Sequence, residues 1–145
     1  QLYARAPFWD RYRDQIESLL LSPKEKLIDV VLPVVNFLKT EFQISTPIKL
    51  SSEIPSWNQG NKKLVDICKH FGGTHFVVRP GSDDYHPGNE FSPFQINFAH
   101  LTYSSITYPQ LHGEFEENLS ALDYLLNCGP GHPPFTNSLK LDSAG

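Results

Sequence analysis

The chain has 145 residues, of which 39% are hydrophobic and 19% are charged, and its formal net charge is −4. This composition is that of a folded chain, and the basic residues form no stripe of the kind that binds nucleic acid. No apolar run reaches the roughly 20 residues that a membrane span needs, and no secretory leader is visible, so we expect a cytoplasmic location.

The first part of the chain predicts two amphipathic helices. Apolar residues recur at helical spacing over 8–21, and charged residues fill the opposite face. The segment 22–25 is typical of a capped helix start and predicts a second helix after it. We expect a kink or break near Leu32, because Pro33 lies inside this helix. The expected buried face consists of Leu27, Val31, Val35, Leu38 and Phe42.

From residue 47 onward, strand and helix patterns alternate. We expect strands at 47–50, 75–78 and 95–103, helices at 61–71 and 118–127, and a loop at 79–88. Ser120 together with Asp123, or Asn118 alone, can cap the last helix. Because strand, helix, strand over 47–78 is a parallel βαβ pattern, the sequence predicts a single α/β domain over 1–130. Its sheet is short and mostly parallel with helices packed on its faces, and a flexible tail follows at 131–145.

The cysteines and histidines form no recognisable metal site. Cys68 and Cys128 stand alone in apolar segments, so we expect two buried thiols rather than a disulfide. No zinc-hydrolase spacing, nucleophile elbow or glycine-rich phosphate loop occurs in the sequence. The common hydrolase, kinase and dinucleotide-binding interpretations therefore fail, and the sequence indicates no metal and no particular cofactor.

The first candidate site follows the predicted strand 47–50. Ligands bind at the carboxyl ends of strands in open α/β sheets, and Ser51, Ser52 and Glu53 offer hydroxyls and a carboxylate for a polyol or a phosphate. The alternative is a loop that caps a helix. Lys62 and Lys63 lie in the first turn of the next predicted helix, where cations oppose the helix dipole. They indicate either a bound anion or two exposed lysines.

The second candidate site is the loop after strand 75–78. Gly81 is a turn glycine there, and Asp83, Asp84, Tyr85 and His86 bring two carboxylates, a phenol and an imidazole. The carboxylates suit acid–base catalysis, with Asp84 as the candidate catalytic residue and Gly81 and Tyr85 as candidate substrate contacts. The alternative is an acidic surface turn.

The third candidate site is the segment 108–115. Tyr108, Gln110, His112 and Glu114 alternate along it, and all four side chains can bind or transfer protons. Histidine is the natural general base at neutral pH, so His112 is the leading catalytic candidate, with Glu114 beside it. The alternative is a histidine with a structural role.

Several blocks of the chain, in this order, resemble the WbqC-like family of bacterial proteins. The blocks are 3–8, 51–54, 64–69, Pro80-Gly81 with Tyr85, 108–115, 118–123 and 127–130. The family is associated with O-antigen and other surface-polysaccharide biosynthesis, without a settled reaction. The resemblance therefore implies motif membership rather than catalytic roles. The residues concerned are Ser51, Ser52, Glu53, Gly81, Tyr85, Tyr108, Gln110, His112, Asn118 and Asp123.

The departures from the family pattern concern one missing segment and a few positions. Family members usually begin with a further segment, so the resemblance implies that this chain is the C-terminal portion of a longer protein. The absence of Met from the chain agrees with a processed or truncated piece. Val78-Arg79 and Ser82 replace family residues around the Pro-Gly loop, and Lys62 replaces an acidic residue.

These observations favour a transferase that acts on a nucleotide-linked or lipid-linked sugar in polysaccharide biosynthesis. His112 would be the base, Tyr108 and Gln110 would hold sugar hydroxyls, and Asn118 is a further candidate substrate contact. Phosphate would be held by Ser51, Ser52 and Lys63. A nucleotidyltransferase-like domain and a non-catalytic sugar-binding or assembly module are the alternatives. A separate N-terminal half or a second copy of the chain is the expected protein partner.

Overall fold

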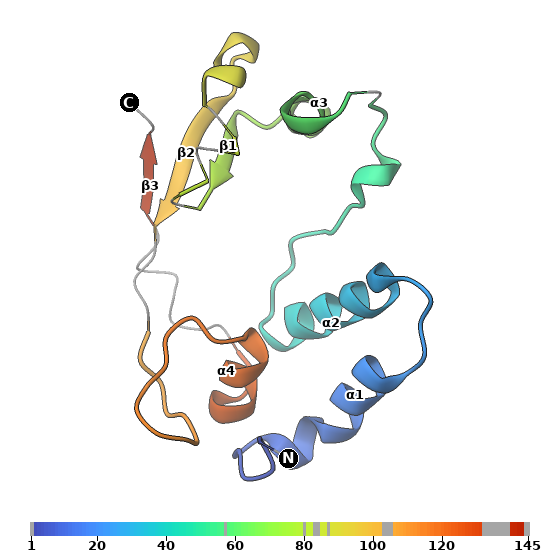
Figure 1. Cartoon of the computed structure of the whole chain (residues 1–145), viewed down its shortest axis with the longest axis vertical. Coiled ribbons are helices and arrows are strands. Elements are labelled where there is room, and N and C mark those ends of the chain that lie inside the picture. The colour runs from blue at the N-terminus through green and yellow to red at the C-terminus, as the bar shows by residue number, and fades with distance from the viewer. Residues whose placement is uncertain are drawn as a thin grey trace. The chain divides into compact units, whose positions relative to one another are not determined.

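The computed structural model describes residues 2–56, 58–79, 81–82, 85–86, 88–102, 106–131 and 140–143. The chain forms two compact units (Figure 1). Gln1–Thr46 and Ser105–Pro134 make the first, here called the helical unit, and Pro47–Ser104 with Phe135–Gly145 makes the second, the sheet unit. The domain predicted over 1–130 is therefore described below as two units.

The helical unit is built from three α-helices, α1 (Trp9–Leu21), α2 (Leu27–Glu41) and α4 (Ala121–Cys128) (Figure 1). Their apolar faces meet in a core whose buried side chains are Ala6, Tyr12, Ile16, Phe37, Phe42, Leu125 and Leu126. The ring of Tyr12 packs edge-on against Phe37 with 5.7 Å between centroids. Helical periodicity thus predicts α1 closely, because Tyr12 and Ile16 are buried on one face, whereas α4 begins three residues later than the predicted 118–127.

The start of α2 differs from the prediction. Ser22 does not cap it, because its hydroxyl donates to the carbonyl of Ser18 at 2.5 Å and so closes the end of α1. The helix begins at Leu27, after Lys26 as the N-cap residue, and no side chain caps it. The predicted break near Leu32 is also absent, since α2 runs through Pro33 to Glu41. A single proline removes one backbone hydrogen bond from a helix, and the remaining backbone hydrogen bonds of α2 are sufficient to keep the helix continuous.

The predicted buried face of α2 is only partly correct. Phe42 is buried and Leu38 packs against the core, whereas Leu27, Val31 and Val35 are 79%, 42% and 38% exposed. Exposure is concentrated in the first half of α2, and Phe37 in its second half is the residue of this helix that is buried in the core. Periodicity identified the helix, but the extent of its burial depends on partners far away in the sequence.

The sheet unit combines helix α3 (Gly60–His70) with strands β1 (His75–Val78), β2 (Asn97–Thr102) and β3 (Lys140–Ser143). Strand β2 lies between the other two (Figure 1). It is parallel to β1, with His75 opposite Asn97, and antiparallel to β3, with Ala99 opposite Ser143. The predicted α/β class is confirmed, and the sheet is mixed. Its core consists of Val65, Val78, Phe91, Ile96 and Phe98.

The predicted βαβ unit over 47–78 is wrong. Residues 44–50 form no helix or strand, and the parallel partner of β1 is β2. Two short 3-10 turns, Gly88–Glu90 and Ser92–Phe94, lie between these strands. The sequence also did not predict β3. None of the helices in the described ranges is long and apolar enough to cross a membrane.

Candidate functional site

A buried carboxylate lies at the start of α4 in the helical unit. The residue is Asp123, and it is 4% exposed. Its Oδ2 atom accepts hydrogen bonds from the hydroxyl of Tyr108 at 2.7 Å and from Nε2 of Gln110 at 3.4 Å. One turn along the helix, Nδ2 of Asn127 donates to Asp123 Oδ1 at 3.2 Å. These donors offset the large cost of burying a carboxylate.

Local sequence places this carboxylate by fixing the start of α4. Ser120 is the N-cap residue, and its hydroxyl oxygen accepts from the backbone N–H of Leu122 at 3.0 Å. This confirms Ser120 among the two predicted caps. Asn118, the other, has a φ of +58°, a left-handed conformation that asparagine tolerates better than most residues. Asp123 then falls in the first turn, where a negative charge also stabilises the helix dipole.

Residues 108–116, here called the site loop, form a loop that the side chain of Gln110 closes by two hydrogen bonds to the backbone of Glu116. Its amide Nε2 donates to the carbonyl of Glu116 at 3.0 Å, and the backbone N–H of Glu116 donates back to Gln110 Oε1 at 2.9 Å. The ring of Tyr108 packs edge-on against Phe115 and Tyr124, with centroids 5.4 and 5.1 Å apart. The polar ends of Tyr108 and Gln110 are thus used to shape the loop.

The site loop presents His112 and Glu114 to solvent, and both are exposed. Nε2 of His112 lies 3.1 Å from the carbonyl oxygen of Leu2. A carbonyl oxygen only accepts, so Nε2 is the nitrogen that bears the proton in this contact. Nδ1 of the neutral ring then carries the lone pair, which is the state a general base requires.

The phenols around Asp123 are held in their protonated form. Burial, with the hydrogen bond to Asp123 as the second cause, raises the pKa of Tyr108 to about 12. The same two causes, in the same order, raise the pKa of Tyr3. Both tyrosines therefore act as donors at neutral pH.

The two cysteines are free and half-buried. Burial raises the pKa of the Cys68 thiol, and burial followed by the charge of Asp123 raises that of Cys128. Raised thiol pKa values reduce the thiolate fraction at neutral pH and so disfavour a nucleophilic role. Among the described residues, no group of three or more His, Cys, Asp or Glu side chains could hold a metal ion.

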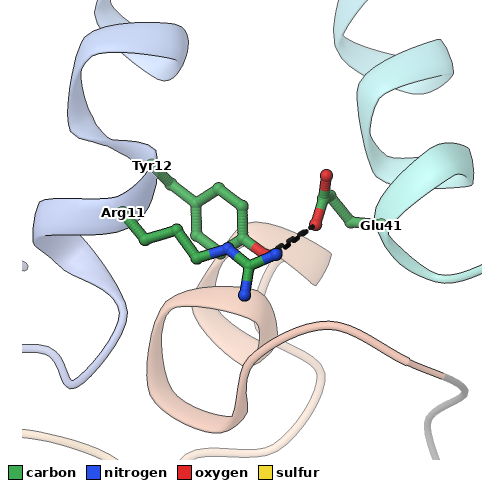
Figure 2. A network of polar contacts seen from close by, with 3 residues as sticks. All are labelled: Arg11, Tyr12 and Glu41. Atoms are coloured by element: carbon green, nitrogen blue, oxygen red, sulfur yellow. Dashed lines mark hydrogen bonds and ion pairs between the residues drawn. The ribbon is translucent and has the colours of Figure 1, made fainter.

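A second tyrosine–carboxylate pair joins α1 to the end of α2. The hydroxyl of Tyr12 donates to Glu41 Oε2 at 2.6 Å, and Arg11 Nη2 lies 4.0 Å from the same oxygen (Figure 2). Burial, followed by the hydrogen bond to Glu41, raises the pKa of Tyr12 to about 12. This pair connects α1 to the last residue of α2, and we assign it a structural role.

In the sheet unit, Ser51–Glu53 forms a 3-10 turn. The Glu53 carboxylate accepts from the backbone N–H of Leu50 at 3.2 Å, which is the capping role given above as the alternative. Ser51 and Ser52 are exposed. Their hydroxyls remain candidate ligand contacts by prediction.

The second candidate loop approaches the first turn of α3. The amide of Asn61 donates to the carbonyl of Tyr85 at 3.3 Å, and its oxygen lies 2.8 Å from Nδ1 of His86. Lys63 lies in the same helical turn and is half-buried, whereas the Tyr85 side chain is 78% exposed. Gly81 has a φ of +81°, so it serves as the predicted turn glycine. Asp83 and Asp84 lie outside the described residues.

The predicted site residues therefore fall into two sets. Tyr108, Gln110, His112, Glu114 and Asn118 belong to the helical unit, and Ser51, Ser52, Glu53, Lys63, Gly81 and Tyr85 belong to the sheet unit. Sequence reasoning assigned no role to Asn127 and treated Asp123 only as a motif member and possible cap. Asp123 and Asn127 are four residues apart in an otherwise leucine-rich helix, and this spacing could have indicated that their side chains lie on the same helix face.

Comparison with known proteins gives one family and one relative. The model of the WbqC-like protein family matches residues 1–133. Uncharacterized protein Rv1507c of Mycobacterium tuberculosis is 26% identical over 103 residues, which is 70% of this chain and 45% of that protein. The chain thus spans less than half the length of this relative. No solved structure matches the chain.

Proposed function

The chain belongs to the WbqC-like protein family, and we propose that it is a cytoplasmic transferase of bacterial surface-polysaccharide (O-antigen) biosynthesis. Its substrate is a nucleotide-linked or lipid-linked sugar, with an amino sugar as the group that is modified. Two arguments support this proposal. The family is associated with such pathways, and the site loop carries a histidine oriented by a main-chain carbonyl.

The observation that carries the proposal is the contact between His112 and Leu2. Because Nε2 donates to the Leu2 carbonyl oxygen at 3.1 Å, Nδ1 is the basic nitrogen. In the proposed reaction, Nδ1 takes the proton of an acceptor hydroxyl or amine as that group bonds to the transferred group. The bond to the phosphate of the donor breaks, and the phosphate leaves with the electron pair. Glu114, two residues further along the exposed loop, is the second proposed catalytic group.

The remaining substrate contacts are proposed from side-chain chemistry. Ser51, Ser52 and Lys63 bind phosphate, and Tyr85 and Asn118 contact the sugar. Tyr108 and Gln110 act chiefly by shaping the site loop, given their bonds to Asp123 and Glu116. Completion of the site by an N-terminal segment or a second copy of the chain is part of the same proposal.

A thermal-shift screen tests the substrate class. Nucleotide sugars, free nucleotides and free sugars are compared at equal concentration with wild type, His112→Ala and, as a matched control, His70→Ala. His70 is an exposed histidine in the last turn of α3, and its ring contacts that of Phe71. We expect nucleotide sugars to raise the melting temperature, and His70→Ala to respond like wild type.

Two other outcomes would contradict the proposal. Equal stabilisation by ATP or CTP would favour the nucleotidyltransferase-like alternative. Stabilisation by free sugar alone, with no change of the sugar on incubation, would favour a non-catalytic binding module.

A further inference from the structure

Helix α4 holds both partners of the hydrogen bond between His112 and Leu2. On the side of His112, the site loop is attached to α4 through Asp123, which accepts from Tyr108 at 2.7 Å and from Gln110 at 3.4 Å. Gln110 in turn closes the loop through the main chain of Glu116. In the sequence, His112 lies between Gln110 and Glu116. Its position therefore depends on the hydrogen bonds that these two residues make.

On the side of Leu2, the N-terminal segment 2–8 is attached to the other end of α4. The backbone N–H of Phe8 donates to the carbonyl of Leu126 at 3.1 Å. The Phe8 ring also lies directly over Gly129, where an added Cβ would come within 2.4 Å of the ring. A turn from Tyr3 to Ala6, closed by a bond of 2.9 Å, then brings Leu2 back toward the site loop. Ala6 itself is buried.

From this arrangement we propose that Asp123 is a positioning residue: by binding Tyr108 and Gln110, its buried carboxylate holds the site loop so that His112 Nε2 donates to the Leu2 carbonyl. The consequence is an imidazole whose Nδ1 is left as the basic nitrogen. This inference rests on the role of His112 in the proposed function. Asp123 itself touches no substrate.

A carboxylate is the group that this position requires. An ionised carboxylate only accepts hydrogen bonds, and here four side chains donate to it: those of Tyr3, Tyr108, Gln110 and Asn127. An asparagine of the same shape would direct an NH₂ group at some of these donors. The substitution Asp123→Asn therefore preserves volume while it breaks the attachment of the loop.

The helical unit offers a matched control for this attachment. Tyr12 and Glu41 form the same type of bond, at 2.6 Å, between α1 and the end of α2. Tyr12→Phe and Tyr108→Phe each remove one phenolic hydroxyl from a carboxylate while leaving the ring in place. A purely structural role for Asp123 predicts that the two variants affect His112 alike.

The test is the NMR signal of the His112 ring Nε2–H proton in the full chain labelled with ¹⁵N-histidine. A ring proton bonded to a carbonyl exchanges slowly enough with water to be observed, whereas that of a free exposed histidine is lost. The signal is assigned by its absence in His112→Ala. We expect it in wild type and Tyr12→Phe, and we expect its loss in Tyr108→Phe and Asp123→Asn.

Three results would overturn the inference: no signal in wild type, a signal that persists in Tyr108→Phe, or an equal loss in Tyr12→Phe. If Asp123→Asn does not fold, Tyr108→Phe decides alone. The NMR measurement uses no ligand, so its result does not depend on whether any compound in the thermal-shift screen binds. Conversely, a persistent signal together with nucleotide-sugar binding would reject the positioning role and keep the proposed function.

Discussion

At the scale of single residues, the helical unit uses one arrangement twice, a phenol that donates to a carboxylate. Tyr12 binds Glu41 and Tyr108 binds Asp123, at 2.6 and 2.7 Å. In both pairs burial is the main cause that raises the pKa of the tyrosine to about 12. Because the phenol must stay protonated to donate, both bonds are sensitive to alkaline pH.

The sign of this pH dependence follows from the raised pKa values. An unfolded tyrosine titrates near 10 and these two titrate near 12, so the folded state keeps its protons longer. The stability they contribute is fully present below about pH 10 and is lost as pH rises toward about 12. We therefore expect the free energy of unfolding, measured in urea from pH 8 to 11.5, to fall steeply above pH 10.

The double variant Tyr12→Phe/Tyr108→Phe is the control for this experiment. It should be less stable at pH 8, by about 1–3 kcal/mol for each bond to a charged group, and should show a shallower fall above pH 10. Equal slopes in the two proteins would show that other groups cause the alkaline loss.

At the scale of elements, local signals predicted most helices and strands well. Helix 61–71 and strand 75–78 were expected and are found as Gly60–His70 and His75–Val78. Their limits follow from nearby features, such as Gly72, whose φ of +65° suits a glycine after a helix. By contrast, the strand expected at 47–50 is absent and β3 was missed, because strand formation requires a distant partner that local patterns do not identify.

Helix α2 tests this difference between periodicity and burial. Phe37 is 6% exposed in the core, whereas Val31 is 42% exposed. We expect Phe37→Ala to lower the free energy of unfolding by about 3–5 kcal/mol, and Val31→Ser to change it by about 0.5 kcal/mol or less. Urea unfolding of both variants measures this. A large loss in Val31→Ser would mean that the first half of α2 is buried after all.

The end of α4 allows a second matched comparison. Gly129 and Gly113 both have positive φ, +86° and +63°, but an added Cβ meets the Phe8 ring only at Gly129. Gly113→Ala should therefore cost only the backbone strain, about 1–2 kcal/mol. Gly129→Ala should cost more, since the Phe8 ring must also move and since ψ of −172° at Gly129 belongs to a backbone region that essentially only glycine adopts.

Melting temperatures of the two glycine variants check this comparison. Equal losses would contradict the close packing of Phe8 on Gly129, and with it one of the contacts that attach segment 2–8 to the end of α4.

At the scale of the whole molecule, the sequence proposed several site residues within one segment but did not predict the contacts that hold them in place. Tyr108, Gln110 and His112 were recognised because their chemistry is dense within one short segment. The role of Asp123 was not, because its donors Tyr108 and Gln110 lie 15 and 13 positions away along the chain and only folding brings them to it. Likewise, the contact between His112 and Leu2 joins residues 110 positions apart. Such contacts leave no trace in local patterns.

The division into two units also separates the predicted groups. The proposed base and its loop lie in the helical unit, and the proposed phosphate contacts lie in the sheet unit. The family match over residues 1–133 extends across both. The requirement for His112 in the proposed transfer can therefore be tested without any assumption about the sheet unit.

The most direct measurement is transfer itself, followed by mass spectrometry with a panel of nucleotide-sugar donors and amino-sugar acceptors. Wild type, His112→Ala and His70→Ala are compared under single-turnover conditions with the donor that gives the largest thermal shift. Loss of a general base typically costs about 10²–10⁴-fold in rate, so we predict that fall in His112→Ala and an unchanged rate in His70→Ala. Transfer by His112→Ala at the wild-type rate, or no transfer by wild type with any donor, would contradict the account.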